Sequence, residues 1–495
     1  MMKKLIGYVG RYFYVMGVVA HWLLAICLVL GIFIGSYIYN QYDLPADIFM
    51  KRVVSSLENT SSPLFQKLAQ PVSYIAEHFI SSEDFSVPHV VLSQKLIGAS
   101  FENSKITAID TELDERVITH HRRLVSQNYL RKIHVSTAKD FINAIKDAEA
   151  GDNIILSPGQ YNINYSRVYL SAFGQTSYPI RISAEAFGDV SINLNSFEGF
   201  LITGDNWIVE NLKITGVCAK HSGCEHAFHL AGSKNIVIRN NEIVDFNSSI
   251  KVNSSGKIPN RRYPDHILIE SNSIYNTSAR ETHSSVTLVD IVAGNDSIMR
   301  KNYIGDNSKL GGDFTSYAAF LKGNGNNGLV ENNIVNCESS VINDNSTRIG
   351  LSFGGGGTGP SFCRDGNCDS EHSNGVMRNN LILNCSQDVG IYLNRARNST
   401  ISHNSLFNTL GIDVRFKASS VKLFNNLSNG PIRSRDGGKI EVLLNNESEF
   451  DGNIKTIKKV KSEVSRDLCG MKRNRFSNVG ALTMPCLEQV RMKSH

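Results

Sequence analysis

The chain has 495 residues, of which 20% are charged and 41% hydrophobic, with 51 Lys and Arg against 46 Asp and Glu. This length suits one large domain or roughly two to three ordinary ones, and the composition excludes wholesale disorder. The surplus of five positive charges is small, and no run of basic residues is interleaved with aromatic ones. We therefore expect no nucleic-acid partner.

An uncharged apolar run of 27 residues extends from Phe13 to Tyr39. It is long enough to cross a hydrocarbon core of about 30 Å. Lys3, Lys4 and Arg11 precede it, so we expect a single-pass inner-membrane protein whose bulk is periplasmic. A cleaved signal peptide is the alternative, but the run exceeds the usual apolar core of about 7–15 residues and lacks an A-x-A cleavage site.

Eight cysteines lie beyond this run, and an even number in an external compartment predicts disulfides. Short spacings favour two stapled loops and a closed C-terminal tail. The pairs are Cys218 with Cys224, Cys363 with Cys368, and Cys469 with Cys486. A zinc site is the alternative for the first loop, although its spacing fits no standard finger and we assign no metal ligand. Its candidate ligands are Cys218, His221, Cys224, His226 and His229.

Apolar residues at helix spacing predict a helical stalk over Pro45–Phe79, and the segment Val87–Arg131 is charged and mixed. The pattern then changes to a strand, a helix over Ala138–Ala150, a second strand from Asp152, and a turn.

From residue 208 onward the chain repeats a unit in which an apolar residue is followed three positions later by Asn. Successive Asn residues are 30, 31, 30, 30, 48, 24 and 22 positions apart, and the neighbouring apolar residues alternate with a period of two. Short repeats of β-type segments predict a parallel β-helix rather than a helical solenoid. The repeat asparagines are Asn211, Asn241, Asn272, Asn302, Asn332, Asn380, Asn404 and Asn426.

A buried Asn at the same turn of each coil would bond its own backbone and the Asn of the next coil. Cys337 and Cys385 each follow a repeat Asn by five residues. We therefore expect these two cysteines to stack on successive coils, at a separation compatible with a disulfide.

The segment Phe141–Tyr161 and the Asn-Asn turns resemble the right-handed parallel β-helix proteins of the pectin-lyase-like superfamily, which includes pectate, alginate and chondroitin lyases, pectinases and uronan epimerases. The resemblance covers roughly residues 131–445. It implies a right-handed coil and a polysaccharide partner, and calcium as a cofactor is implied by this resemblance alone. The Asp-Pro-His-Asp motif of the periplasmic epimerases is missing, and the calcium-and-base motif of alginate and chondroitin lyases has no good match.

The expected fold class is all-β, a right-handed parallel β-helix preceded by a transmembrane helix and a helical stalk. The expected parts are a cytoplasmic N-terminus at 1–12, a transmembrane anchor at 13–39, a stalk and linking region at 40–130, the β-helix at 131–445 and a C-terminal tail at 446–495.

Counting back ten to twelve residues from each repeat Asn predicts one polar strand face that continues from coil to coil. Coils are about 4.8 Å apart, close to the length of a sugar residue. A merely solvated face is the alternative. The first outward column is His229, Asp290, Phe320, Gly350, Tyr392, Asp413 and Arg433. The second is Ala231, Val292, Lys322, Ser352, Asn394, Arg415 and Arg435.

One coil has an insertion, Gly354–His372, which begins with four consecutive glycines. Long insertions in solenoids often line a binding site, although a plain surface loop is the alternative. Its titratable residues would lie over a hollow between Lys322 and Asn394, and His372 would alternatively cap the next coil. These residues are Arg364, Asp365, Glu371 and His372.

β-Elimination of a uronic polymer needs a base, a group that neutralises the carboxylate, and a proton donor for the leaving oxygen. We expect Lys322 or His372 as the base and Tyr392 as the donor, with arginines as the carboxylate clamp. The expected substrate-binding residues are Phe320, Arg364, Asp365, Glu371, Asn394, Arg415, Arg433 and Arg435.

Hydrolysis instead needs two carboxylates beside the scissile bond, and Asp413 with Asp365 or Glu371 is the available pair. A non-catalytic polysaccharide-binding or assembly protein is the third hypothesis. The leading hypothesis is a polysaccharide lyase anchored to the membrane through its N-terminal helix.

Overall fold

The computed structural model describes residues 128–343, 346–355, 357–448, 457–462, 464–483 and 486, with Val53, Val54, Lys67 and Val72. The chain divides into two compact units, Met1–Phe85 and Ser86–His495, and the β-helix lies in the second. Within the described residues no helix combines the length and apolar character needed to span a membrane. The expected anchor, Phe13–Tyr39, and most of the expected stalk lie outside the described residues.

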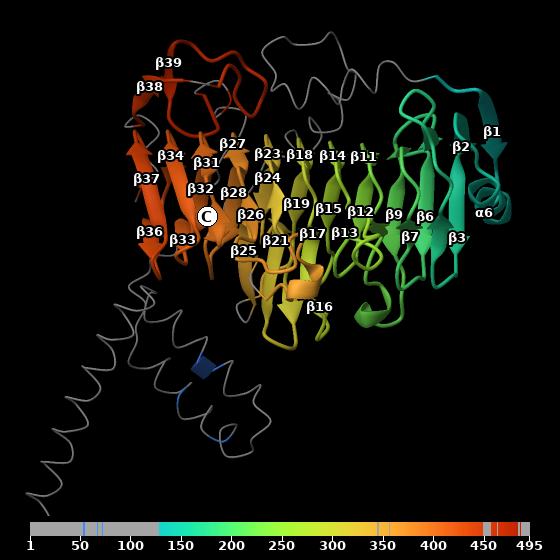
Figure 1. Cartoon of the computed structure of the whole chain (residues 1–495), viewed down its shortest axis with the longest axis horizontal. Coiled ribbons are helices and arrows are strands. Elements are labelled where there is room, and N and C mark those ends of the chain that lie inside the picture. The colour runs from blue at the N-terminus through green and yellow to red at the C-terminus, as the bar shows by residue number, and fades with distance from the viewer. Residues whose placement is uncertain are drawn as a thin grey trace, which may run out of the picture. The chain divides into compact units, whose positions relative to one another are not determined.

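Strand β1 (Arg131–Val135) and helix α6 (Ala138–Lys146) cover the N-terminal end of the β-helix (Figure 1). Thr137 caps the helix, because its side chain accepts a hydrogen bond from the backbone N–H of Asp140. Phe141 and Ile145 are buried against the first coil, where the Phe141 ring lies 6.2 Å from that of Tyr161. The expected strand, helix, strand and turn are therefore confirmed, with the helix ending at Lys146.

Three long parallel sheets form the body of the molecule, and each coil contributes one strand to each sheet, as is typical of a right-handed parallel β-helix. The β1–β37 sheet contains β1 (Arg131–Val135), β2 (Asp152–Leu156), β5 (Ile180–Ala184), β8 (Trp207–Glu210), β11 (Val237–Arg239), β14 (Leu268–Glu270), β18 (Ile298–Arg300), β23 (Leu329–Glu331), β27 (Val376–Arg378), β31 (Ser399–Ser402), β34 (Ser420–Phe424) and β37 (Lys439–Leu444).

The other two long sheets are also built from successive coils. The β4–β36 sheet contains β4 (Val168–Leu170), β7 (Phe200–Ile202), β10 (Phe228–Ala231), β13 (Ile250–Asn253), β17 (Val286–Val292), β21 (Thr315–Lys322), β25 (Thr347–Phe353), β29 (Ile391–Asn394), β33 (Ile412–Arg415) and β36 (Ile432–Arg435). The β3–β35 sheet contains β3 (Gly159–Ile163), β6 (Val190–Leu194), β9 (Lys213–Gly216), β12 (Glu242–Val244), β15 (Ser273–Tyr275), β19 (Tyr303–Gly305), β24 (Ile334–Asn336), β28 (Leu381–Cys385), β32 (Ser405–Thr409) and β35 (Leu427–Ser428).

Shorter elements lie at the corners and at the C-terminal end. They are the parallel strands β22 (Gly325–Asn326), β26 (His372–Ser373) and β30 (Ala396–Arg397), the parallel pair β16 (Arg280–Glu281) and β20 (Lys309–Leu310), the antiparallel pair β38 (Lys459–Lys461) and β39 (Phe476–Asn478), and the 3-10 turns η1 (His221–Gly223) and η2 (Pro360–Phe362).

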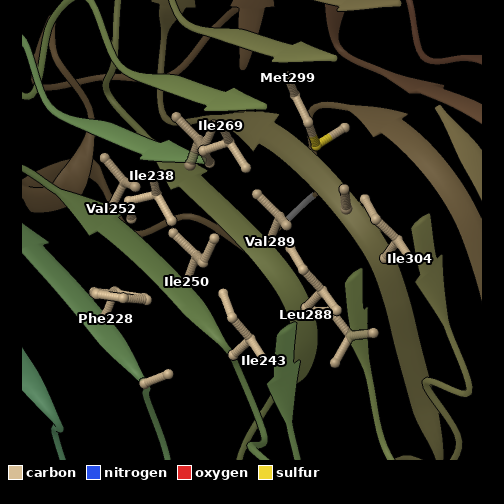
Figure 2. Close-up of a cluster of buried hydrophobic side chains, with 14 of the residues drawn as sticks. Phe228, Ile238, Ile243, Ile250, Val252, Ile269, Leu288, Val289, Met299 and Ile304 are labelled. Carbon is tan, nitrogen blue, oxygen red and sulfur yellow. The ribbon is translucent and has the colours of Figure 1, made fainter. Parts of the chain in front are cut away.

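The core fills the interior of the coils with aliphatic side chains that repeat in register. Figure 2 shows Ile238, Ile269 and Met299 stacked on successive coils of one sheet. Each of them is at most 1% exposed. Because parallel pairing places like positions over one another, the period-two pattern of the sequence becomes a continuous apolar interior.

A ladder of buried asparagine side chains runs along one corner, as predicted, but two of its members were misassigned. Asn302 shows the pattern: its Nδ2 donates to Ile269 O and to Asn333 Oδ1 at 2.9 and 3.0 Å. Its Oδ1 accepts from Nδ2 of the preceding ladder residue, Asn272, in the same way. The ladder consists of Asn241, Asn272, Asn302, Asn333, Asn380, Asn404, Asn426 and Asn446.

Asn211 and Asn332 instead occupy the position just before the ladder position, which holds Leu212 and Asn333, and there the backbone has φ of 63° and 55°. Asn tolerates this left-handed conformation better than most residues. The repeated Asn-Asn pair therefore has two causes, a strained corner and a buried amide, and the sequence pattern alone did not separate them.

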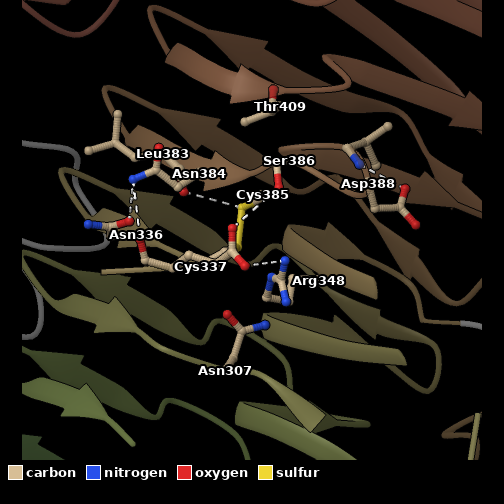
Figure 3. Close-up of a disulfide and its surroundings, with 12 residues drawn as sticks. Asn307, Asn336, Cys337, Arg348, Leu383, Asn384, Cys385, Ser386, Asp388 and Thr409 are labelled. Atoms are coloured by element: carbon tan, nitrogen blue, oxygen red, sulfur yellow. Dashed lines mark hydrogen bonds and ion pairs between the residues drawn. A yellow bond between two sulfur atoms is a disulfide. The ribbon is translucent and has the colours of Figure 1, made fainter. Parts of the chain in front are cut away.

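The described residues form four disulfides, three in the β-helix and one in the C-terminal tail, and all four expected pairs are confirmed. They are Cys218–Cys224, Cys337–Cys385, Cys363–Cys368 and Cys469–Cys486. Figure 3 shows the bridge between successive coils, where the Cα atoms of Cys337 and Cys385 are 5.0 Å apart. The zinc alternative is wrong for the first loop, because both of its cysteine sulfurs are in a disulfide. Several disulfides in one chain are typical of an extracytoplasmic protein.

The described part of the C-terminal tail packs on the outside of the β3–β35 sheet. Val460, Val479 and Leu482 join an apolar cluster with Leu383 and Phe407, which point outward from that sheet. The sequence did not predict this packing.

Candidate functional site

The outer face of the β4–β36 sheet carries the polar residues that the sequence predicted, and we call this face the track. Val292 pairs with Lys322, and Asn394 pairs with Arg415, as expected. Gly354 lies between Lys322 and Asn394, because its N–H donates to Leu321 O and a Cβ there would lie 1.8 Å from Asn394 O. Lys322 and Arg415 are therefore in one outward column of one sheet.

The predicted register is wrong for the coil that carries the insertion. Ser352, not Gly350, pairs with Phe320. A Cβ on Gly350 would lie 3.0 Å from the Ile382 side chain, so Gly350 faces the core. The insertion lies between strand β25 and Asn380, so counting back ten to twelve residues from this Asn ends inside the insertion and could not set the position of the strand.

The sequence prediction also omitted one coil of the track. Strand β13 lies between β10 and β17, and Lys251 on it points outward between His229 and Asp290. Lys251 forms an ion pair with Asp290, and His229 Nε2 lies 2.6 Å from Asn253 Oδ1. The loop after β13 is long, so counting back ten to twelve residues from Asn272 ends inside the loop.

Lys322 lies at the centre of the track without an ion-pair partner among the described residues. Its Nζ is 4.2 Å from the centre of the Phe320 ring. A Cβ on Gly355 of the insertion would lie 3.2 Å from Lys322 Cδ and from Phe320. Burial lowers the pKa of Lys322 below the ordinary lysine value of 10.5, and the nearby Asp290 partly opposes this.

Phe320 was expected to offer a flat apolar surface to a sugar. It is 4% exposed, because Lys322 and the insertion lie over it and the Tyr317 ring packs at 5.1 Å. Phe320 therefore supports Lys322 from below rather than facing a ligand.

Tyr392, Asn394 and Arg415 form a connected polar group two to three coils beyond Lys322. The Tyr392 hydroxyl accepts from Asn394 Nδ2 at 3.3 Å and from Arg415 Nη1 at 3.5 Å. Arg415 Nε donates to Asp436 at 2.5 Å. Burial raises the pKa of Tyr392 above 10, and Arg415 opposes the rise, so the phenol stays protonated near neutral pH.

Asp413 was expected to act as a catalytic carboxylate, but it has a structural partner. Arg435 donates to both of its oxygens, and Asp413 is 1% exposed. Arg433 donates to Leu410 O at 3.2 Å. Asp413 is therefore unavailable as an open acid or base, and Arg435 is held by it.

The insertion is fixed to the β-helix by polar contacts, which occupy most of its expected ligand-binding groups. Arg364 forms an ion pair with Asp265 at 2.5 Å and lies 4.3 Å over the Tyr263 ring. The exposed Asp365 accepts from two backbone N–H groups of its own loop. Glu371 accepts from the N–H of Gly323 at 3.0 Å and is 1% exposed. The expected hydrolase pair thus consists of carboxylates with structural roles.

His372 is not a base on the track, which corrects the sequence prediction. It lies in the corner strand β26 and is fully buried, with its ring stacked at 4.4 Å on the core residue Phe353. Burial lowers its pKa to about 3. Period-two counting across the insertion could not predict this corner strand.

Three oxygen atoms around the track are buried without a hydrogen-bond donor within the described part of the chain. They are Asp290 Oδ1, Glu371 Oε1 and Asn394 Oδ1. Buried acceptors usually have a partner, so these atoms mark positions where a ligand hydroxyl would be favourable. Two of them belong to residues that the sequence placed in the site.

The oxygen atoms on the track that could act as metal ligands do not suit a calcium ion. Calcium prefers six to eight oxygen ligands, mostly from carboxylates that are free to coordinate it. Asp290, Asp413 and Asp436 are each bound by a cationic side chain. The described residues contain two groups of closely spaced potential ligands, and both include cysteines in disulfides.

Comparison with known proteins gives no family assignment: no protein-family model and no curated protein matches the chain. Solved structures match weakly. An alginate lyase from Paenibacillus sp. str. FPU-7 has a TM-score of 0.36 and 18% identity, over 64% of this chain and 98% of that chain.

Two further structures match at a similar level. Pectate lyase Pel9A has a TM-score of 0.45 and 12% identity, over 72% of this chain and 98% of that chain. A mannuronic-acid-specific family 6 lyase from human gut microbiota has a TM-score of 0.39 and 15% identity, over 64% of this chain and 78% of that chain. At these values the likeness assigns neither a family nor an activity to this chain.

Proposed function

We propose that this chain is a membrane-anchored, extracytoplasmic protein that acts on a uronic-acid-containing polysaccharide by β-elimination along the track. The observation that carries this proposal is Lys322, a partly buried amine that lies over the Phe320 ring, with a lowered pKa and no ion-pair partner among the described residues. An amine in this state is suited to remove a proton from a sugar carbon, because its neutral form is more accessible than that of an ordinary lysine.

We assign the other two groups that the reaction needs to Tyr392 and Arg415, which lie two and three coils from Lys322, so that the side chains must extend toward one another along the track to act on one sugar. Because the Tyr392 oxygen already accepts two hydrogen bonds, its own O–H is left to donate to the leaving oxygen. Arg415 has N–H groups beyond those given to Asp436 and Tyr392, and these would bind the uronic carboxylate and stabilise the charge that develops on it. Arg435 has a smaller role in this proposal, because Asp413 holds it.

The unpaired acceptors supply a reason for sugar binding at this place. Hydroxyl groups of a polymer lying along the track would donate to Asp290 Oδ1 and Asn394 Oδ1, which lie on opposite sides of the Lys322 coil. With coils about 4.8 Å apart, successive sugars would face successive strands.

The test uses the full-length chain in detergent, incubated with a panel of uronic polymers. Growth of ultraviolet absorbance from unsaturated products supports the lyase. Reducing ends without that absorbance would favour a hydrolase, and retention of polymer without turnover would favour a binding protein. Lys322→Met is expected to abolish the absorbance, and the exposed Lys422→Met on another sheet serves as the control.

The anchor is a separate part of the proposal. A reporter enzyme that works only outside the cytoplasm, fused after residue 45, is expected to be active. A reporter active only in the cytoplasm would contradict the proposed orientation.

A further inference from the structure

The outer face of a different sheet, β1–β37, carries an apolar stripe that is not part of the core. Its residues pair in register across six successive strands, and they alternate with inward core residues such as Ile269 and Met299. They form a cluster of their own. The stripe consists of Ile208, Val237, Leu268, Ile298, Leu329 and Val376.

A ladder of alternating charges runs beside this stripe on the same six strands. Arg300 Nη1 lies 2.7 Å from Glu270, and Arg300 Nε lies 3.0 Å from Glu331. Arg378 continues the ladder to Glu331 at 2.8 Å. The ladder consists of Glu210, Arg239, Glu270, Arg300, Glu331 and Arg378.

Most of both rows is buried although they point away from the coil interior, and Arg239, Val376 and Arg378 are partly buried. Ile298 and Leu329 are 0% exposed and Arg300 is 1% exposed. The next strand, β31, continues the stripe with Thr400, where the apolar row ends. Side chains on an open sheet face would be hydrated, and a buried Arg is rare unless it is covered and paired. Something therefore covers this face over six strands.

We propose that residues 86–127 of the same chain form this cover. The chain enters the described region on this face, because the guanidinium of Arg181 lies 5.7 Å from the centre of the Tyr129 ring. Arg181 is on strand β5 and pairs with Ile208, the first residue of the stripe. Residues from Ser86 onward belong to the same compact unit as the β-helix. Continuity from Tyr129 makes this segment the nearest available occupant.

The length and pattern of the segment fit the face. Six strands span about 24 Å, which needs roughly 16 residues of helix or seven of extended chain. Residues 86–127 supply 42 residues. Leu113, Val117 and Leu124 recur at helix spacing, which would place them against the stripe.

The charges of the segment also complement the ladder. Glu112, Asp114 and Glu115 precede Arg122 and Arg123. If the chain runs toward Tyr129 on β5, the acidic end approaches the strands that carry Arg300 and Arg378, while the basic end approaches Glu210. The cover would then tie the linking region to the β-helix and leave the track, on another sheet, open.

The first test places a photo-crosslinking amino acid at Val117 in the full-length chain. We expect crosslinks, within one chain, to peptides that contain Leu268 or Ile298. The same amino acid at the half-exposed Val217, beyond the β3–β35 sheet, is the control and is expected to give no crosslink to residues 112–127. Crosslinks between two chains would overturn the proposal in favour of a second copy, and an absence of crosslinks to the β1–β37 sheet would also overturn it.

The second test measures trypsin cleavage after Arg122 and Arg123. Leu268→Gln is expected to release the segment and speed this cleavage about tenfold, because proteolysis follows the population of the open state. Val117→Asp alters the segment instead of the sheet, so the test holds even where the sheet variant does not fold. Unchanged cleavage in Val117→Asp would contradict the proposal. Because the track lies on another sheet, failure of this test leaves the lyase proposal unaffected.

Discussion

Arg435 donates through Nε and Nη2 to the carboxylate of Asp413 on the preceding coil, with 2.5 Å between Nη2 and Oδ2. The two partners are unequally buried: the Arg435 side chain is 23% exposed and that of Asp413 is 1% exposed. Removing Arg435 therefore leaves a buried carboxylate, whereas removing Asp413 leaves a guanidinium that is partly exposed.

Arg435→Met is expected to lower the free energy of unfolding by about 3 kcal/mol, because it leaves a buried carboxylate unpaired. Asp413→Asn is expected to cost about 1 kcal/mol, because the remaining guanidinium reaches water. Urea denaturation of both variants at neutral pH measures this difference. Equal losses would contradict the asymmetry.

A second prediction concerns the pH dependence of turnover. Catalysis by Lys322 needs the neutral amine, and burial lowers its pKa from the ordinary value of 10.5. We expect kcat/KM to rise with pH and to level off below 10.5. Lys322→Met should remove both the activity and its pH dependence, while polymer binding changes only a few-fold. A rate that falls as pH rises through the neutral range would exclude this role.

The asparagine ladder gives a third prediction. Asn333→Ala leaves the backbone N–H and Nδ2 of Asn302 without their acceptor and Met299 O without its donor. We expect a loss of about 2–4 kcal/mol in the free energy of unfolding. Asn332→Gly, one position earlier, is the matched control and should cost less than about 1 kcal/mol, because Gly adopts φ of 55° freely. A larger loss of stability for Asn332→Gly than for Asn333→Ala would indicate that Asn332, and not Asn333, is the ladder residue.

The fourth prediction concerns acid stability. Burial lowers the pKa of His372 to about 3 in the folded protein, against an ordinary value of 6.5. The unfolded chain therefore binds the proton first as pH falls, and stability is lost below about pH 6.5. His372 alone should account for about 2 kcal/mol at pH 5.

His372→Phe keeps a ring against Phe353 and removes this dependence. The difference in unfolding free energy between variant and native protein should shift by about 2 kcal/mol in favour of the variant from pH 7.5 to pH 5. His226 and His403, whose pKa values burial lowers to about 4 and about 3, contribute to both proteins and cancel. A constant difference across this range would show that His372 is not buried as a neutral ring.

The sequence predicted the features that repeat. The Asn spacing located the coils, and it placed Cys337 and Cys385 on successive coils, where they form a disulfide. Such predictions succeed because stacked coils convert equal spacing along the chain into direct contact. They failed where a coil has an irregular loop, as at Lys251 and Ser352.

The site was harder to predict than the fold, because partners across coils decide what a polar residue can do. Asp413 and Arg364 have suitable chemistry, but ion pairs to Arg435 and Asp265 occupy them. His372 faces the core because its short strand forms a corner that period-two counting does not anticipate. The local sequence pattern also does not predict that Arg300, at an outward strand position, is buried.

The amide ladder extends without interruption from Asn241 to Asn446, and the side-chain hydrogen bonds within it join each Asn to the ladder Asn before it and the one after it. Cooperativity in such a linear array is carried from neighbour to neighbour rather than through a common centre. A defect at an internal rung such as Asn333 therefore divides the stack into two cooperative blocks. The block next to helix α6 keeps the end that this helix covers, whereas the other block loses its connection to that end, so damage to one coil would spread mainly toward the C-terminus.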